Sequence, residues 1–121
     1  MKQTFVIHGR LPGMNEYTSS QRNNKYSGAG MKKKAQNTAE VYIRYARLKP
    51  IDRPTYIQYT FYEPNKRRDK DNIAGFAHKV IQDALVATRI LKDDGWDYIT
   101  GFSDDFKIDK KEPRIEVTLI Y

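Results

Sequence analysis

The amino-acid sequence predicts an α+β fold in a single domain of residues 1–121, with a mixed β-sheet and two main helices packed mainly on one face, in the order β-α-β-α-β-β. Three observations predict it. Four segments alternate between apolar and polar residues, as strands do. Two further segments carry apolar residues at steps of three and four, as helices do. A length of 121 residues is enough for one hydrophobic core.

The four predicted strands are recognised by their alternation and by the turn residues that bound them. The clearest is 56–62, in which Ile57, Tyr59 and Phe61 share one face. The others are expected at 4–10, at 97–106 and after Pro113. The residues around the third strand are assigned to turns or to packing: Asp104, Asp105 and Asp109 to a turn, and Trp96 to the core as a packing anchor.

Two amphipathic helices are predicted between these strands. The first covers 31–49 and places Lys32, Lys33 and Lys34 in its first turn, where their charge opposes the helix dipole. The second follows Asn72 and has the strongest apolar periodicity in the chain, with Asp71 or Asn72 suited to be its N-cap. The stretch 11–30, rich in Gly, Ser and Asn, is expected to be a long flexible loop.

Composition and charge narrow the functional classes. A net charge of +7 and a pI near 9.6 favour a polyanionic partner, most simply nucleic acid. The absence of cysteine excludes disulfides, cysteine-ligated zinc and thiol catalysis. No signal peptide and no apolar run of membrane-spanning length is recognisable, so a cytoplasmic protein without membrane contact is expected.

An acidic pair follows a run of cations ahead of the second helix. Asp69 and Asp71 are two residues apart, and in an extended chain such side chains point the same way at a spacing of about 6.6 Å. Mg²⁺ commonly binds one or two carboxylates and keeps positions for water and phosphate. The pair is therefore a candidate metal site, and the alternative is a solvated strand end.

Several cationic and polar residues are candidates for contact with nucleic acid. The run before the acidic pair would position backbone phosphates, the expected loop would contribute a polar and an aromatic side chain, and the first helix would contribute lysines. The candidates are Lys66, Arg67, Arg68, Asn15, Tyr17, Lys32, Lys33 and Lys34. Both histidines, His8 and His78, are expected to be partly exposed rather than metal ligands.

These residues resemble a known family. The pattern Arg-Arg-Asp-x-Asp-Asn at 67–72, a helix ending in Asp-Ala-Leu at 83–85 and Leu-x-Asp-Asp at 91–94 is similar to the RusA family of Holliday junction resolvases, often carried by prophages. The stretch 11–17 looks like that family's opening loop, and the closing strand also fits. The resemblance implies a homodimeric, Mg²⁺-dependent endonuclease that makes paired symmetric nicks in four-way DNA junctions during recombination and repair, with Mn²⁺ possible in place of Mg²⁺ and no organic cofactor.

The resemblance also implies roles for individual residues. The family's two closely spaced metal-binding aspartates fall on Asp69 and Asp71, and its third falls on Asp94, with Asp93 as a substitute. The family lysine falls on Lys79 if one helical turn is inserted before it, because Gly75 occupies the usual position. The expectation is that the three carboxylates gather in one pocket, hold one or two Mg²⁺ against the scissile phosphate, and are assisted by Lys79.

Two other functions fit the same residues. In the first, the chain is a non-catalytic DNA- or RNA-binding module whose aspartates cap a helix and relieve the charge of the basic patch. In the second, it is a metal-dependent nuclease for other branched DNA or for RNA. Cleavage assays with and without Mg²⁺, on competing substrates, separate these functions.

Overall fold

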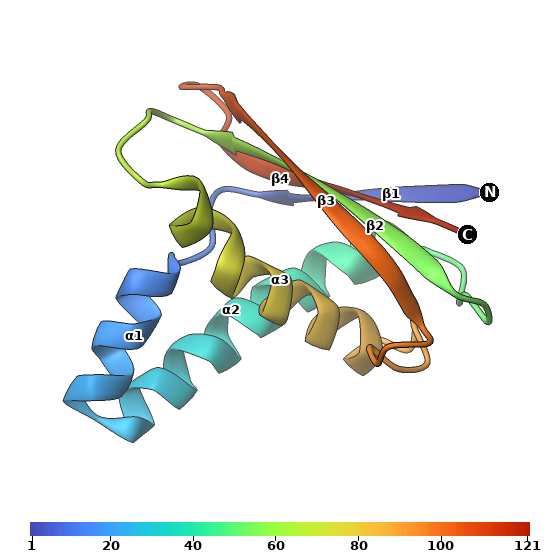
Figure 1. Ribbon diagram of the computed structural model, residues 1–121, viewed down its shortest axis with the longest axis horizontal. Helices are drawn as coiled ribbons and strands as arrows, with labels where there is room; N and C mark the ends of the chain where they lie inside the picture. Colours follow the sequence, from blue (N-terminus) through green and yellow to red (C-terminus); the bar gives the residue numbers. More distant parts are fainter.

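The alternating segments pair into one four-stranded sheet in a computed structural model that describes residues 1–121 (Figure 1). The strands are β1 (Lys2–His8), β2 (Thr55–Glu63), β3 (Ile99–Ile108) and β4 (Arg114–Ile120). Their order across the sheet is β1-β4-β2-β3. β4 runs antiparallel to β1 and β2, whereas β3 runs parallel to β2. The predicted α+β class with a mixed sheet is confirmed.

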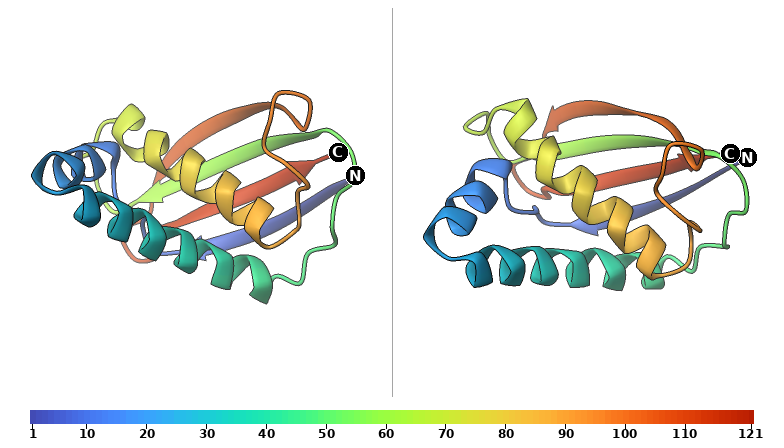
Figure 2. Two further views of the ribbon diagram at one scale, coloured as in Figure 1. Left: turned by 90° about the horizontal axis from the view of Figure 1, so that it is seen from below. Right: turned by 60° about the horizontal axis from the view of Figure 1, so that its bottom comes forward.

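Three helices lie on one face of the sheet: α1 (Met14–Asn23), α2 (Lys25–Tyr45) and α3 (Lys70–Ala87) (Figure 2). The apolar stripe of α3 is buried as expected, and Ile57, Tyr59 and Phe61 of β2 meet it from the sheet. These residues belong to a core of 23 buried side chains, which fixes α3 beside the β2–β3 half of the sheet. None of the helices combines the length and apolar character needed to cross a membrane.

The expected flexible loop at 11–30 is instead helical, so that prediction is wrong. α1 occupies Met14–Asn23, and α2 begins at Lys25, six residues before the predicted start of the first helix. α1 has no buried residue, and a helix without an apolar stripe gives no periodic signal. Since α2 begins earlier, its lysines at 32–34 lie beyond the first turn, and the expected conflict with the helix dipole does not arise.

The third strand also differs from its prediction. β3 covers Ile99–Ile108, so Asp104 and Asp105 belong to the strand and not to a turn, and only Asp109 follows it. Trp96, expected to anchor the core, is 94% exposed. Because β3 is an edge strand, only its pairing with β2 covers it from the side, and acidic side chains are tolerated there.

Arg89, the residue after the C-cap of α3, has a left-handed backbone with a φ of 63°. Side chains with a Cβ are strained in this region, whereas glycine is not. We expect Arg89→Gly to raise the free energy of unfolding by about 0.5–1 kcal/mol, measured by chemical denaturation. Arg89→Ala is the control, because it keeps the Cβ and should give no gain. Equal effects of the two substitutions would contradict this explanation.

Candidate active site

The acidic pair sits at the start of a helix and not in a strand. Asp69 is the N-cap residue of α3, and Asp71 lies in its first turn, so the predicted N-caps, Asp71 and Asn72, are incorrect. The extended spacing proposed for the two carboxylates therefore does not apply. What they share is a groove, which is formed where β2 and β3 end and α3 begins.

This groove, called here the Asp69/Asp71 groove, has a volume of about 780 Å³. Three lysines line it together with the two aspartates, and Lys70 Nζ also lies 5.8 Å from the centre of the Phe106 ring. Its full lining is Glu63, Asn65, Lys66, Arg68, Asp69, Lys70, Asp71, Ile73, Phe106, Lys107 and Ile108. The groove thus combines acidic oxygens with cations that could contact phosphate.

Neither carboxylate of the pair is engaged by the protein. Asp69 makes no side-chain hydrogen bond to the backbone of the helix that it precedes, and neither Asp69 nor Asp71 forms an ion pair. Several other acids of the chain are engaged: Asp83 pairs with Lys32, Asp104 with His78, and Asp109 with Arg114. The oxygens of Asp69 and Asp71 are therefore available to an external cation, and hard carboxylate oxygens suit Mg²⁺.

Asp94 lies in a different groove. This second hollow, the Asp94 groove, is lined by Pro54, Gln82, Asp94, Gly95, Trp96, Asp97, Ile99, Thr100, Gly101 and Phe102. The α3 residues that line the two grooves, Ile73 and Gln82, are separated by about 13–14 Å along the helix axis. Asp93 does not compensate, because it lies on the same turn and its Oδ1 accepts a hydrogen bond from the Asp94 backbone.

The expectation that the three aspartates meet in one pocket of a single chain is therefore wrong. No group of three or more His, Cys, Asp or Glu side chains is placed to hold a metal ion within this chain. The two grooves instead lie at opposite ends of a strip between α3 and β3, here called the α3–β3 seam. At its middle, His78 Nε2 and Asp104 Oδ1 are hydrogen bonded at 2.7 Å. A ligand set drawn from one chain is limited to Asp69 and Asp71.

Aromatic rings pack together in the middle of the seam, and the phenol of Tyr59 among them is not ionised. The His78 ring lies 4.7 Å from Tyr59 and 4.6 Å from Phe102 between ring centres. Burial raises the pKa of the Tyr59 hydroxyl well above its usual value, and Gln82, which hydrogen bonds to it, offsets only part of that effect. Tyr59 therefore remains protonated and is excluded as a general base.

In the folded protein, the Lys79 side chain does not reach Asp69 or Asp71 of the same chain. It is eight residues beyond Asp71, or about 12 Å along the helix, and its side chain is 66% exposed. Its Nζ lies 3.8 Å from Asp83, which also binds Lys32 of α2. Lys79 thus turns toward α2. The cations beside Asp69 and Asp71 are Lys66, Lys70 and Lys107 instead. Sequence reasoning missed Lys107 because only the folded chain brings β3 beside the start of α3, and it passed over Lys70 although that residue lies between the two aspartates.

Arg68 was predicted to contact nucleic acid, but its guanidinium is committed inside the protein. Its Nε and Nη2 donate to the two oxygens of Glu63 at 3.0 and 2.9 Å, and its Nη1 donates to the Leu11 carbonyl at 3.1 Å. Glu63 is only 5% exposed and also accepts from Arg10. This buried pair holds the loop between β2 and α3, so the role of Arg68 is to position the acidic pair. Lys66 and Arg67 are exposed and remain candidates.

The other residues predicted to contact nucleic acid also fall into two groups: side chains with partners inside the protein, and exposed side chains. Tyr17 stacks on Phe76 at 4.4 Å and packs against the core, and Lys32 is paired with Asp83. Lys33 and Lys34 are exposed and line a shallow hollow on α2. Asn15 is exposed on α1, where its backbone N–H is hydrogen bonded to α3. The lysines at 33 and 34 are thus the free cations of the predicted lysine run.

Asn72, the last residue of the Asp-x-Asp-Asn motif, caps a neighbouring helix. Its Oδ1 accepts a hydrogen bond of 2.7 Å from the backbone N–H of Asn15, in the first turn of α1. Gly13 allows this approach, because a Cβ at that position would lie 2.6 Å from the same oxygen. Sequence reasoning missed this contact, since residues 57 positions apart form it. The motif therefore joins α1 to the acidic pair.

We expect Gly13→Ala to lower the free energy of unfolding by about 1–3 kcal/mol, because the added methyl group displaces the Asn72 cap. Asn72→Ala alone should cost about 1 kcal/mol through loss of the cap. Combined with Asn72→Ala, the Gly13→Ala change should cost much less than on its own, since the clashing atom is gone. Urea denaturation of the four proteins in this cycle measures the coupling, and strict additivity would contradict the contact.

Comparison with known proteins adds no relative: no protein family model matches the sequence, and no curated protein matches it significantly. The resemblance to RusA resolvases thus depends on the motif residues themselves.

Proposed function

We propose that this protein is a Mg²⁺-dependent endodeoxyribonuclease that resolves four-way DNA junctions as a homodimer, in DNA recombination and repair. The observation that carries the proposal is the Asp69/Asp71 groove, in which two carboxylates without protein partners lie among three lysines. Two unpaired carboxylates at one site repel each other, and a divalent cation relieves that repulsion. The lysines can hold the phosphate that a nuclease must bind.

The residues of the groove have separate tasks in this proposal. Asp69 and Asp71 would hold Mg²⁺, with Mn²⁺ as a substitute, and the ion would supply charge neutralisation and a lowered pKa for the attacking water. Lys70 and Lys107 would position the scissile phosphate from the two walls of the groove. Lys66 and Arg67, exposed at its rim, would bind flanking phosphates and read no bases.

The third carboxylate would come from a second copy of the chain. β3 is an edge strand, and three apolar side chains there are exposed: Trp96, just before the strand, at 94%, and Phe102 and Ile108 within it, each at 49%. Exposed apolar side chains gathered along one edge are typical of a surface that another protein covers. The proposed dimer places the α3–β3 seams of two copies against each other.

A two-fold axis through the middle of the seam makes the two seams antiparallel. The Asp94 groove includes residues 99–102 of β3, and the Asp69/Asp71 groove includes residues 106–108. An axis near residues 103 and 104 therefore sets the Asp94 groove of one copy beside the Asp69/Asp71 groove of the other. Each dimer then has two sites of three aspartates, and two symmetric sites suit two symmetric nicks.

The test is a nicking assay on a synthetic four-way junction, with and without Mg²⁺. We expect paired nicks at symmetric positions that require the ion. Flap, linear duplex and RNA substrates compete in the same assay, and preferential cleavage of one of these would assign the nuclease to another branched DNA or to RNA. Sedimentation velocity over a concentration series measures the dimer, and a monomer at all concentrations would contradict the shared site.

A non-catalytic nucleic-acid-binding module is the second candidate, and the lack of a metal-binding cluster within one chain favours it. It predicts junction binding without Mg²⁺-dependent cutting. Binding alone does not separate the two functions, because in either case affinity should fall steeply with salt as counterions are released. Cleavage by the wild-type protein, lost on substitution of Asp71, is the result that distinguishes the enzyme.

A further inference from the structure

The second free edge of the sheet is β1, and it lacks the usual protection against pairing. β1 pairs with β4 from Lys2 to His8 in an unbroken register, without a bulge, and contains no proline. Its other side faces no strand. Proteins usually block such an edge with charges, proline or bulges, and Lys2 at the end of the strand is the only one of these devices here. The backbone of β1 is thus open to hydrogen bonding by an added strand.

A groove with apolar and aromatic walls runs beside this edge. It has a volume of about 500 Å³ and lies between β1 and the C-terminal part of α2. Its lining residues are Thr4, Phe5, Val6, His8, Tyr42, Tyr45 and Ala46. Tyr45 is 79% exposed, and Val41, one helical turn before it, is 47% exposed. An added strand could therefore place every second side chain against apolar walls.

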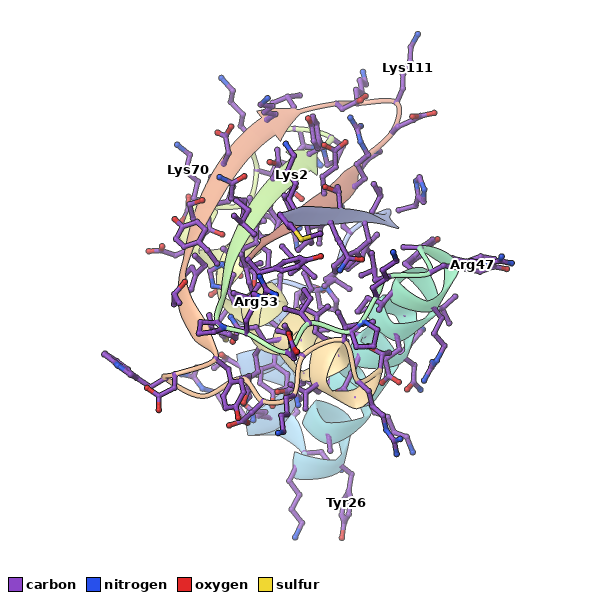
Figure 3. All side chains as sticks on the ribbon, turned by 90° about the vertical axis from the view of Figure 1, so that its right-hand side faces the viewer. Lys2, Tyr26, Arg47, Arg53, Lys70 and Lys111 are labelled. Carbon is purple, nitrogen blue, oxygen red and sulfur yellow. The ribbon has the colours of Figure 1, made fainter.

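The exposed charges around the groove are basic. Lys49 is adjacent to β1, because its backbone N–H and C=O form hydrogen bonds of 2.8 and 2.9 Å with the Gln3 side chain. Arg44 and Arg47 flank the lining residues Tyr45 and Ala46, and Lys2 begins the strand itself; Figure 3 shows Lys2 on β1 and Arg47 projecting away from the end of α2. Two acids lie near the groove, and both are paired: Glu40 is bound by Arg44, and Glu116, the partner of Val6 on β4, is bound by Arg114.

From these three features we infer that β1 and its groove bind an extended acidic segment of another protein by strand addition. The partner strand forms main-chain hydrogen bonds with the free edge of β1. Its apolar side chains, two residues apart, lie in the groove against Tyr42 and Tyr45. Its carboxylates meet the surrounding cations. The charge and the free backbone edge together favour an acidic peptide over nucleic acid, which cannot form a β-ladder.

The probe is a fluorescein-labelled nonapeptide of alternating valine and aspartate, titrated with the full-length protein and followed by fluorescence anisotropy. Two control peptides replace aspartate with lysine or place proline at the central position. We expect saturable binding of the first peptide, and binding at least about tenfold weaker for each control, because one control reverses the charge and the other breaks the ladder. The amide resonances perturbed in nuclear magnetic resonance spectra should be those of β1.

Tyr45→Ala should weaken binding of the valine–aspartate peptide by about tenfold, the effect of removing an aromatic contact from an interface. Tyr26→Ala is the matched control, because Tyr26 is an equally exposed tyrosine, at 75%, at the opposite end of α2 (Figure 3). Both residues are on the surface, so neither change should unfold the protein, and circular dichroism checks this. The Tyr26→Ala protein should bind as the parent does.

Several results would overturn the inference. These are an absence of saturable binding up to about 1 mM, equal binding of the proline peptide, and amide changes confined to β3. Binding of a single-stranded oligonucleotide that depends on Tyr45 would assign the surface to nucleic acid. Self-association abolished by Tyr45→Ala would assign it to a second copy of this chain.

Discussion

Asp71→Asn is expected to reduce Mg²⁺-dependent nicking of a four-way junction by about 10²–10³-fold or more, because it removes one of the two charged groups proposed to hold the metal ion in the Asp69/Asp71 groove. Junction binding should be unchanged or tighter, since the substitution removes a negative charge beside the DNA. Nicking by purified proteins and binding by gel shift without Mg²⁺ measure the two effects. Wild-type nicking by the Asp71→Asn protein would contradict the enzymatic proposal.

The proposed sharing of a site between two copies makes a sharper test possible. Asp94→Asn should also abolish nicking, but a mixture of the Asp71→Asn and Asp94→Asn proteins should recover activity. In each mixed dimer, one site combines the intact Asp71 of one copy with the intact Asp94 of the other, while the second site carries both substitutions. The mixture should therefore nick one strand of a junction. If all three aspartates acted within one chain, no mixture of the two proteins would regain activity.

Glu63→Ala should lower the free energy of unfolding by about 3–5 kcal/mol, because it leaves the Arg68 guanidinium without its bidentate partner in a site where that side chain is 15% exposed. Loss of one partner from a buried ion pair is among the most costly single substitutions. Chemical denaturation monitored by circular dichroism measures the change.

The control for that prediction is Glu16→Gln. The Glu16 side chain is 58% exposed and lies 3.8 Å from Arg68, so its ion pair should contribute about 1 kcal/mol or less. A similar small effect of Glu63→Ala would show that Arg68 is adequately solvated without Glu63. Nicking by the Glu16→Gln protein should match that of the parent.

The elements with strong periodicity were predictable, and the edge elements were not. The stripe of α3 and the alternation of β2 both reflect burial against one core, and both are found where the sequence predicts them. β3 was displaced by two residues and its aspartates were assigned to a turn, because an edge strand needs fewer apolar residues. The connection between α3 and β3, residues 88–98, also carries an exposed Trp96, and an exposed tryptophan has no sequence signature.

Only part of the candidate site was predictable, namely the residues that are near one another in the chain. The motif located Asp69 and Asp71, whose neighbours in the chain are also their neighbours in space. The position of Asp94 depends on the length and direction of α3, which carries the chain away from the acidic pair before β3 begins. The place of Lys107 depends on the strand order, and the ion pair between Arg68 and Glu63 depends on how the loop between β2 and α3 folds. The spacing of residues in the sequence gives neither the direction of a helix nor the arrangement of the strands and loops in the folded protein.

The cap that Asn72 provides to α1 has a consequence for the order in which the molecule assembles. α1 is ten residues long and buries no side chain fully, so it cannot persist by itself in water. Its first turn is completed only after α3 has formed and docked. α1 should therefore be the last helix to fold and the first to open, and its amide protons should exchange with solvent long before those of α3.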